Sequence, residues 1–127
     1  GSFGLECLSR GADKITFVEK DENIAKILNQ NLSNLPIKNK SVIINDEILN
    51  FLKRKNSEYF EIIFFDPPFA ELNYVNELKM IREKKIYKKN HVVIIHRESN
   101  CDDPIQNIIN TIIIKKYGRS KIIFGKF

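Results

Sequence analysis

Apolar and polar positions follow one another along the chain in a pattern that predicts a strand and then a helix. Residues 14–21, KITFVEKD, form a β-branched and aromatic run that ends in charged residues, as expected of a strand. Asp21 is a residue type that begins helices, and four apolar residues follow it at helical spacing. These residues are Ile24, Ile27, Leu28 and Leu32.

The same succession is repeated further along the chain. Residues 41–46 (SVIIND) and 59–66 (YFEIIFFD) are predicted strands, with a short helix between them at residues 47–55. Residues 71–85 carry apolar positions at helical spacing, and residues 91–98 (HVVIIHRE) form a fourth strand. Continuous apolar strands that alternate with helices indicate the α/β class, with a mostly parallel sheet covered by helices on both faces.

The end of the chain breaks this alternation. Residues 112–116 and 121–127 are strand-like runs, and the turn-like Tyr117-Gly118-Arg119-Ser120 separates them. They predict a C-terminal antiparallel hairpin on the edge of the sheet. Parallel units that close in such a hairpin are typical of Rossmann-like methyltransferase sheets and not of dinucleotide dehydrogenases.

The first residues, GSFGLECLSRGA, look like the inside of a glycine-rich turn followed by a short helix. Gly1 and Gly4 fit the last two glycines of a G-x-G-x-x-G turn, and Gly11 suits the end of the helix. The first glycine and the strand before it would lie upstream, so we expect the first strand of the sheet to be missing from this chain. The alternative is a cloning remnant at Gly1-Ser2 and an ordinary turn glycine at Gly4.

Size and charge narrow the function further. The 127 residues, 43% of them hydrophobic, suit a single domain over residues 1–127, and no apolar run approaches the roughly 20 residues that span a bilayer. We expect a cytoplasmic protein with two free thiols. Residues 1–78 carry 9 Lys+Arg and 12 Asp+Glu (−3), whereas residues 79–127 carry 12 and 4 (+8). The basic part is either a solvated surface or one that meets phosphates.

Acidic residues follow three of the predicted strands: Glu19, Asp46 or Glu47, and Asp66. In an open α/β sheet, ligands bind beyond the carboxyl ends of the strands, and a carboxylate can accept both hydroxyls of a ribose. Pro67 and Pro68 come directly after Asp66 and fix two φ angles, so the chain must leave the sheet in one rigid direction.

The sequence resembles a known family. Asp66-Pro67-Pro68-Phe69 has the form of the (D/N)PP(F/Y) motif of methyltransferases that modify exocyclic amino groups. The wider string GSFGLECLSRGA…FVEKD…DEILNFL…FDPPF…YGRSKIIF resembles the RsmD-type bacterial ribosomal RNA (guanine-N2)-methyltransferases. This likeness implies a Rossmann-like fold and S-adenosyl-L-methionine as the cofactor. It implies that the substrate is 16S ribosomal RNA in a small-subunit particle. It also implies that the protein is a monomer and needs neither a metal nor a membrane.

The resemblance also implies roles for single residues. Asp66 and the carbonyl of Pro67 would accept the two hydrogens of the target amine, while Phe69 would stack on the extruded base. The two prolines, Pro67 and Pro68, would hold that carbonyl in a fixed direction. For the cofactor, the expected contacts are Gly1 and Gly4 with the methionine part, Glu19 with the ribose, and Asp46 or Glu47 with the adenine amine.

Two other hypotheses about the function also fit the sequence, and one residue departs from the family's pattern. The chain could be an amino methyltransferase for adenine N6 or for a protein glutamine, or a Rossmann-like nucleic-acid-binding module without catalysis. His96 stands where we expect a glutamate in relatives. The basic segment Arg82–Lys89, together with Tyr117, Arg119 and Lys121, is expected to contact phosphates and to orient RNA.

Overall fold

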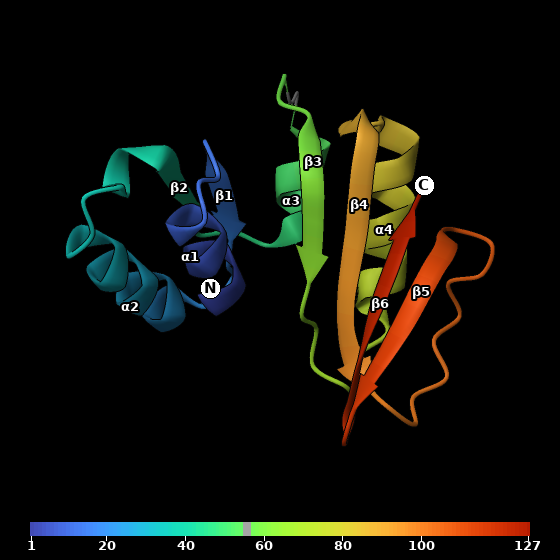
Figure 1. Cartoon of the computed structure of the whole chain (residues 1–127). Coiled ribbons are helices and arrows are strands. Elements are labelled where there is room, and N and C mark those ends of the chain that lie inside the picture. Colours follow the sequence, from blue (N-terminus) through green and yellow to red (C-terminus); the bar gives the residue numbers. More distant parts are fainter. Residues whose placement is uncertain (55–56) are drawn as a thin grey trace. The chain divides into compact units, whose positions relative to one another are not determined.

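The computed structural model describes residues 1–54 and 57–127, without the side chain of Lys38. The chain consists of two compact units, Gly1–Arg54 and Lys55–Phe127 (Figure 1). The first unit contains α1 (Ser2–Ser9), β1 (Ile15–Val18), α2 (Glu22–Ser33), the 3-10 turn η1 (Lys38–Lys40), β2 (Ser41–Ile44) and α3 (Ile48–Lys53). The second contains β3 (Phe60–Phe65), α4 (Asn73–Lys84), β4 (Tyr87–Glu98), β5 (Asn110–Tyr117) and β6 (Ser120–Lys126).

The first unit is a parallel two-stranded sheet with α1 and α2 on one face. β1 and β2 pair in register from Ile15 with Ser41 to Val18 with Ile44. Leu8 of α1 and Leu28 and Leu32 of α2 form one buried cluster. The partly buried residues packed against it are Leu5, Ile15, Phe17, Ile37 and Ile43. Because both helices contribute to this single cluster, they cover the same face of the sheet.

Local signals set the start of α2 and the end of α1 as predicted. The side chain of Asp21 accepts a hydrogen bond from the backbone N–H of Ile24 at 3.0 Å, which caps α2. Gly11 has a φ of +99°, a conformation that suits glycine after a helix. The apolar face of α2 is narrower than predicted, because Ile24 and Ile27 are 50% and 56% exposed.

The short helix predicted at residues 47–55 is α3, which covers Ile48–Lys53. Lys55, the last residue of that prediction, lies outside the described residues. Leu52 is 1% exposed and is the buried residue of this helix. In the part of the chain that the structure describes, no helix combines the length and apolar character that crossing a membrane requires.

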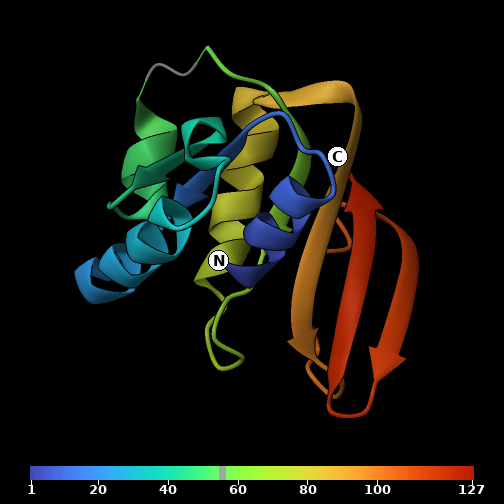
Figure 2. The same ribbon diagram turned by 60° about the vertical axis from the view of Figure 1, so that its left-hand side comes forward.

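The second unit is a four-stranded mixed sheet in the order β3-β4-β6-β5. β3 and β4 are parallel, whereas β6 is antiparallel to both β4 and β5. α4 packs against one face of this sheet (Figures 1 and 2). The guanidinium carbon of Arg97 in β4 lies 4.7 Å above the ring of Tyr74 in α4. The α/β class, the parallel strand pairs and the C-terminal antiparallel hairpin are therefore confirmed.

β4 is longer than the sequence predicts, because it begins at Tyr87 and not at His91. Tyr87 pairs with Phe60 of β3, and its ring centroid lies 4.4 Å from that of His91 and 4.9 Å from that of Phe127. These contacts join residues far apart in the sequence. Because of them, the lysine-rich stretch that follows Tyr87 forms part of a strand. The segment 82–89 is consequently divided between the end of α4 and the start of β4.

The hairpin of β5 and β6 turns at Gly118, whose φ is +59°. A residue with a side chain is strained in this left-handed region, so glycine suits the turn. β6, the second strand of the hairpin, lies between β4 and β5. β5 is therefore an edge strand, and all of its residues are exposed.

Candidate functional site

The DPPF loop, Asp66–Phe69, leaves the sheet directly after β3. Its four residues line an open depression of about 260 Å³. The carbonyl of Pro68 accepts a hydrogen bond from the N–H of Glu71 at 2.9 Å, which closes a tight turn. The predicted rigid exit from the strand is thus built from two prolines and one turn.

Asp66 and Phe69 present their side chains to solvent within this loop. The side chain of Asp66 is 60% exposed, and its Oδ1 lies 2.8 Å from Nδ1 of His96 at the end of β4. Phe69 is 40% exposed, and its ring meets the ring of His96 edge to face at a centroid distance of 5.7 Å. His96 therefore contacts both the acid and the aromatic residue of the loop.

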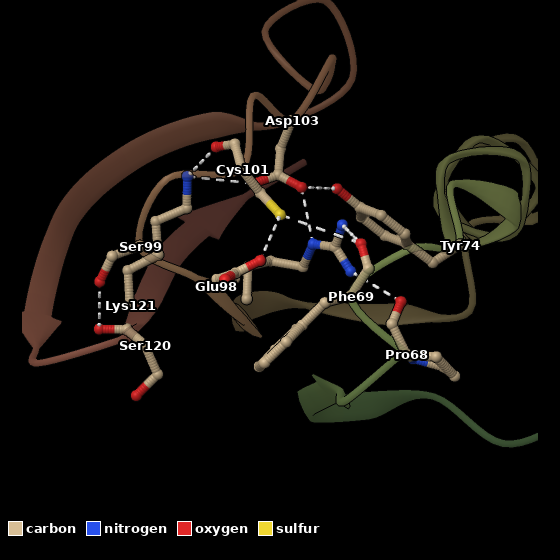
Figure 3. Close-up of polar contacts among 10 residues, drawn as sticks. Pro68, Phe69, Tyr74, Glu98, Ser99, Cys101, Asp103, Ser120 and Lys121 are labelled. Atoms are coloured by element: carbon tan, nitrogen blue, oxygen red, sulfur yellow. Dashed lines mark hydrogen bonds and ion pairs between the residues drawn. The ribbon is translucent and has the colours of Figure 1, made fainter.

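Arg97, the next residue of β4, holds the backbone of the DPPF loop from the inside. Its Nη1 donates to the carbonyl of Pro68 at 3.1 Å and its Nη2 to the carbonyl of Phe69 at 2.8 Å. Its Nε donates to Oδ1 of Asp103 at 2.7 Å. Figure 3 shows Pro68, Phe69 and Asp103, the residues that supply these acceptors, close together.

Asp103 is the centre of this buried cluster. The hydroxyl of Tyr74 donates to its Oδ1 at 2.6 Å, and Nζ of Lys121 lies 3.1 Å from its Oδ2. Burial by itself would raise the pKa of Asp103, but hydrogen bonds from Tyr74, Arg97 and Lys121 outweigh it and lower the pKa. Burial, reinforced by the bond to Asp103, raises the pKa of Tyr74. The cluster accordingly holds an ionised carboxylate and a neutral phenol.

Glu19 stands directly after β1, in the first unit, as predicted. Its backbone N–H donates to the carbonyl of Ile44 at 3.0 Å, which continues the β1–β2 ladder. The side-chain amide of Asn45 donates to the carbonyl of Glu19 at 2.8 Å. One carboxylate oxygen of Glu19 accepts from the N–H of Asp21 at 2.9 Å, which orients the half-buried side chain. The carboxyl ends of β1 and β2 are thereby joined.

Asp46 and Glu47, the two candidates for the adenine contact, differ in their surroundings. Oδ1 of Asp46 accepts from the N–H of Glu47 at 2.8 Å and from the side chain of Asn50 at 3.0 Å, while its Oδ2 pairs with Arg54. The Asn50 bond, aided by Glu47 and Arg54, lowers the pKa of Asp46 despite an opposing effect of burial. Asp46 therefore organises the start of α3, whereas Glu47 is exposed at its N-cap.

Gly1 is the N-cap of α1, and Gly4 lies inside this helix. A Cβ atom on Gly4 would lie 2.3 Å from Cε1 of Phe17, and one on Gly1 would lie 2.6 Å from Cδ1 of Leu28. Gly4 is thus a site of close packing, the role expected of the last glycine in a G-x-G-x-x-G turn, whereas Gly1 meets only the end of a flexible leucine side chain. Their contact with a cofactor stays a prediction.

The basic residues that were expected to contact RNA fall into two groups within the second unit. The β5–β6 turn lies at the same end of β4 as the DPPF loop, because Ser99 donates to the carbonyl of Gly118 at 2.9 Å. The segment 82–89 meets the opposite end of β4. Tyr117 and Arg119 are exposed beside the turn.

The prediction for Lys121 is wrong. Lys121 is 8% exposed. Its ammonium donates to the carbonyl of Cys101 at 2.5 Å and also pairs with Asp103. A lysine held in this way supports the buried cluster and is not available to a phosphate. The alternation of β6 directs this side chain inward, toward the face of the sheet that α4 covers.

Sequence reasoning missed Arg97, Asp103 and Tyr74. The available signal was an arginine inside the apolar run of residues 91–98, because a buried guanidinium must find partners. Those partners could not be named from the sequence, since Pro68 and Phe69 lie almost 30 residues away along the chain.

The order of elements and the position of the DPPF loop define the class of protein. The parallel pairs β1–β2 and β3–β4, the closing antiparallel hairpin and the loop at the carboxyl end of β3 give a Rossmann-like methyltransferase fold. The chain belongs to the family described as Conserved hypothetical protein 95, whose model matches residues 1–126. The resemblance to RsmD-type proteins is thereby confirmed.

Curated relatives agree with this family. The chain is 34% identical over 118 residues to ribosomal RNA small subunit methyltransferase D of Haemophilus influenzae. It is 39% identical over 69 residues to the protein of the same name from Escherichia coli K12. These matches involve 91% and 54% of the chain. The chain spans 60% of the length of the first relative and 34% of the second.

Solved structures support the fold. A candidate methylase from Haemophilus influenzae superimposes with a TM-score of 0.85 at 28% identity, over 98% of this chain and 79% of that one. A conserved hypothetical protein from Streptococcus pyogenes gives a TM-score of 0.86 at 23% identity, over 100% of this chain and 81% of that one.

Proposed function

We propose that this chain is part of a methyltransferase that moves a methyl group from S-adenosylmethionine to N2 of a guanine in 16S ribosomal RNA. The DPPF loop carries the proposal, since it presents the Asp66 carboxylate and the Phe69 ring together on one rigid turn. The names of the relatives support ribosomal RNA as the substrate. A small-subunit particle is the proposed form of that substrate, and the proposed enzyme acts as a monomer in the cytoplasm.

The donor set of the first unit fits S-adenosylmethionine. Glu19, a half-buried residue at the end of β1, offers a carboxylate for the two ribose hydroxyls. Glu47 is the better candidate for the adenine amine, because the oxygens of Asp46 already hold Glu47 N–H, Asn50 and Arg54. Gly1 and Gly4 stay the proposed contacts of the methionine part. The cofactor supplies an activated methyl group on a sulfonium.

The residues of the DPPF loop would make the exocyclic amine of the target base a better nucleophile. The lone pair of an exocyclic amine is delocalised into the purine ring, so the amine attacks poorly. Acceptors aimed at its two hydrogens localise this pair on nitrogen, and Asp66 and the carbonyl of Pro67 are the proposed acceptors. Phe69 would stack on the base after it has left the helix, which fixes the distance and direction of attack.

Methylation of RNA by the full-length protein tests this function. We expect transfer of labelled methyl from S-adenosylmethionine to small-subunit particles, followed by recovery of N2-methylguanosine after digestion to nucleosides. Asp66→Ala and Phe69→Ala should abolish transfer. Tyr59→Ala is the matched control, because Tyr59 is 59% exposed and lies before the start of β3, at the other end from the loop.

Each outcome of this experiment separates the proposal from its rivals. N6-methyladenosine as the product would replace guanine with adenine as the target, and a methylated protein glutamine would exclude RNA. If the full-length protein bound RNA without transferring methyl to any of these substrates, the chain would be a binding module and the proposed catalysis would be wrong.

A further inference from the structure

Arg97 is a charged residue in the most buried part of the second unit. It is 1% exposed, between apolar neighbours of β4 such as Ile95, which is 0% exposed. Removing a guanidinium from water is strongly unfavourable unless its N–H groups are satisfied by hydrogen bonds. Its partners therefore determine where the guanidinium lies and what it does there.

The described partners of Arg97 are two consecutive carbonyls, one carboxylate and one aromatic ring. The carbonyls belong to Pro68 and Phe69 of the DPPF loop, at 3.1 and 2.8 Å. The carboxylate of Asp103 accepts from Nε at 2.7 Å, and the ring of Tyr74 lies 4.7 Å below the guanidinium carbon. The planar guanidinium thus connects the DPPF loop, β4, α4 and the segment that follows β4.

Asp103 makes this connection rigid, because it is fixed by groups other than Arg97. Its carboxylate accepts from the hydroxyl of Tyr74 at 2.6 Å and pairs with Nζ of Lys121 at 3.1 Å. Lys121 belongs to β6, so the strand at the centre of the antiparallel part of the sheet also holds the cluster. Figure 3 shows Tyr74, Asp103 and Lys121 around the point where the loop carbonyls converge.

The two carbonyl contacts fix the conformation of the loop. A carbonyl held in a given direction fixes the plane of its peptide group, and Arg97 holds two consecutive planes. The Phe69 side chain projects from between these planes. The Pro67 carbonyl belongs to the preceding plane, where the φ angle of Pro68 is already restricted by its ring. The direction of Pro67 is therefore set by proline stiffness on one side and by Arg97 on the other.

We propose that Arg97 is a positioning residue for methyl transfer, which sets the Pro67 carbonyl and the Phe69 ring by holding the carbonyls of Pro68 and Phe69. This inference rests on the proposed function, in which Pro67 and Phe69 contact the target base. Arg97 itself stays behind the loop and touches neither base nor cofactor. Lysine cannot take its place, because an ammonium is a compact charge and lacks the planar fork of donors.

Kinetics of the full-length Arg97→Lys variant test this role. We expect kcat to fall about 100-fold, the effect of a displacement of roughly 1 Å at a reacting centre. The Kd for S-adenosylmethionine should be unchanged, because none of its proposed contacts lies in the DPPF loop. Circular dichroism and thermal unfolding show whether the variant is folded at the assay temperature.

Two control variants separate positioning from general effects. Arg10→Lys makes the same chemical change at an exposed arginine that pairs with Glu6 in α1, and kcat should be unchanged. Leu78→Ala removes a core side chain of α4 that is 0% exposed, so it lowers stability without touching the loop. If Leu78→Ala lowered kcat as much as Arg97→Lys at equal folded fraction, the role of Arg97 would be structural only.

A fluorescent reporter tests the inference without relying on methyl transfer. The chain has no tryptophan, so Phe69→Trp introduces a single one into the loop. In this background, Arg97→Lys should lower the fluorescence anisotropy and increase quenching by acrylamide, whereas Arg10→Lys should change neither. Equal anisotropy and quenching in all three proteins would overturn the inference.

The two experiments distinguish failure of the inference from failure of the proposed function. Wild-type kcat in Arg97→Lys would refute the positioning role while the methyltransferase function stands. If the wild-type protein methylated no substrate, the proposed function would fail, and a loosened reporter loop would then still establish that Arg97 holds the DPPF loop.

Discussion

Nδ1 of His96 lies 2.8 Å from Oδ1 of Asp66, so the last part of β4 orients the side chain of the acid at the end of β3. The ring of His96 also meets the ring of Phe69 edge to face. His96 and its neighbour Arg97 thus act on the same loop from opposite faces of one strand, His96 through side chains and Arg97 through backbone carbonyls.

Substitution of His96 tests the importance of this hydrogen bond. We predict that His96→Ala lowers kcat by about tenfold or more, because a hydrogen bond to a charged group contributes ~1.5–3 kcal/mol. His96→Asn should retain much of the activity, since its amide nitrogen can occupy the place of Nδ1. Steady-state methylation assays measure both variants. Equal rates for wild type and His96→Ala would show that Asp66 needs no partner in β4.

Acid unfolding should report on Asp103. Its pKa is lower in the folded state, so its contribution to stability is present above the pKa of an unfolded aspartate, about 3.9, and is lost as the pH falls through the folded pKa. Asp103→Asn should lower stability at pH 7 by about 3 kcal/mol, the usual cost of breaking a buried ion pair. It should also flatten the decline in stability below about pH 4.

Urea unfolding at a series of pH values measures this effect. Asp102→Asn is the matched control, because Asp102 is the exposed neighbour of Asp103 in the same segment. Parallel pH profiles for wild type and Asp103→Asn would show that another carboxylate controls acid stability.

Close packing at Gly4 predicts a stability effect in the first unit. Gly4→Val should lower the free energy of unfolding by about 1–3 kcal/mol, because its Cβ would meet the ring of Phe17 at 2.3 Å. Ser2→Val, an exposed position in the same helix, should have little effect. Thermal unfolding measures both, and adding Phe17→Leu should relieve part of the clash. A fully stable Gly4→Val protein would contradict this packing role.

Cofactor binding should distinguish Glu47 from Asp46. Glu47→Ala is expected to raise the Kd for S-adenosylmethionine about tenfold, as for the loss of one hydrogen bond to a charged acceptor. Asp46→Ala should lower the melting temperature, because Asp46 binds Asn50 and pairs with Arg54. Isothermal titration calorimetry and thermal unfolding on the full-length variants measure the two effects. The opposite pattern would assign the adenine contact to Asp46.

RNA binding should depend on the end of β4 that carries the DPPF loop. Arg119→Ala is predicted to weaken binding of small-subunit RNA and to reduce its salt dependence by about one unit of slope. The double variant Lys84→Ala, Lys85→Ala removes two exposed charges from the opposite end and should have a smaller effect. Filter binding at several salt concentrations compares them. A larger loss for the double variant would locate the RNA surface beside the end of α4.

Much of the fold could be predicted from sequence, because the signals that decide it are local. Asp21 caps α2, Gly118 turns the final hairpin, and the apolar run of residues 60–65 forms β3. The early start of β4 could not be predicted, because it depends on Tyr87 pairing with Phe60 in a parallel ladder.

The chemical groups of the candidate site could be predicted from the sequence, but the residues that hold the DPPF loop in place could not. The DPPF sequence indicates an acid and an aromatic ring on a stiff turn, and the structure has this arrangement. The partners of that turn come from elsewhere in the chain, since His96 lies 30 residues from Asp66 and Arg97 lies 28 residues from Phe69. The inward position of Lys121 depended in the same way on the register between β6 and β4.

The position of β6 between β4 and β5 has a consequence for how the protein folds during its synthesis. During synthesis, N-terminal segments emerge first, and β3, the DPPF loop and β4 leave the ribosome before the strand that supplies Lys121. Until then Asp103 lacks one of its two cationic partners, and β4 has an unpaired edge. The buried cluster behind the DPPF loop is therefore completed only after β6 has paired with β4.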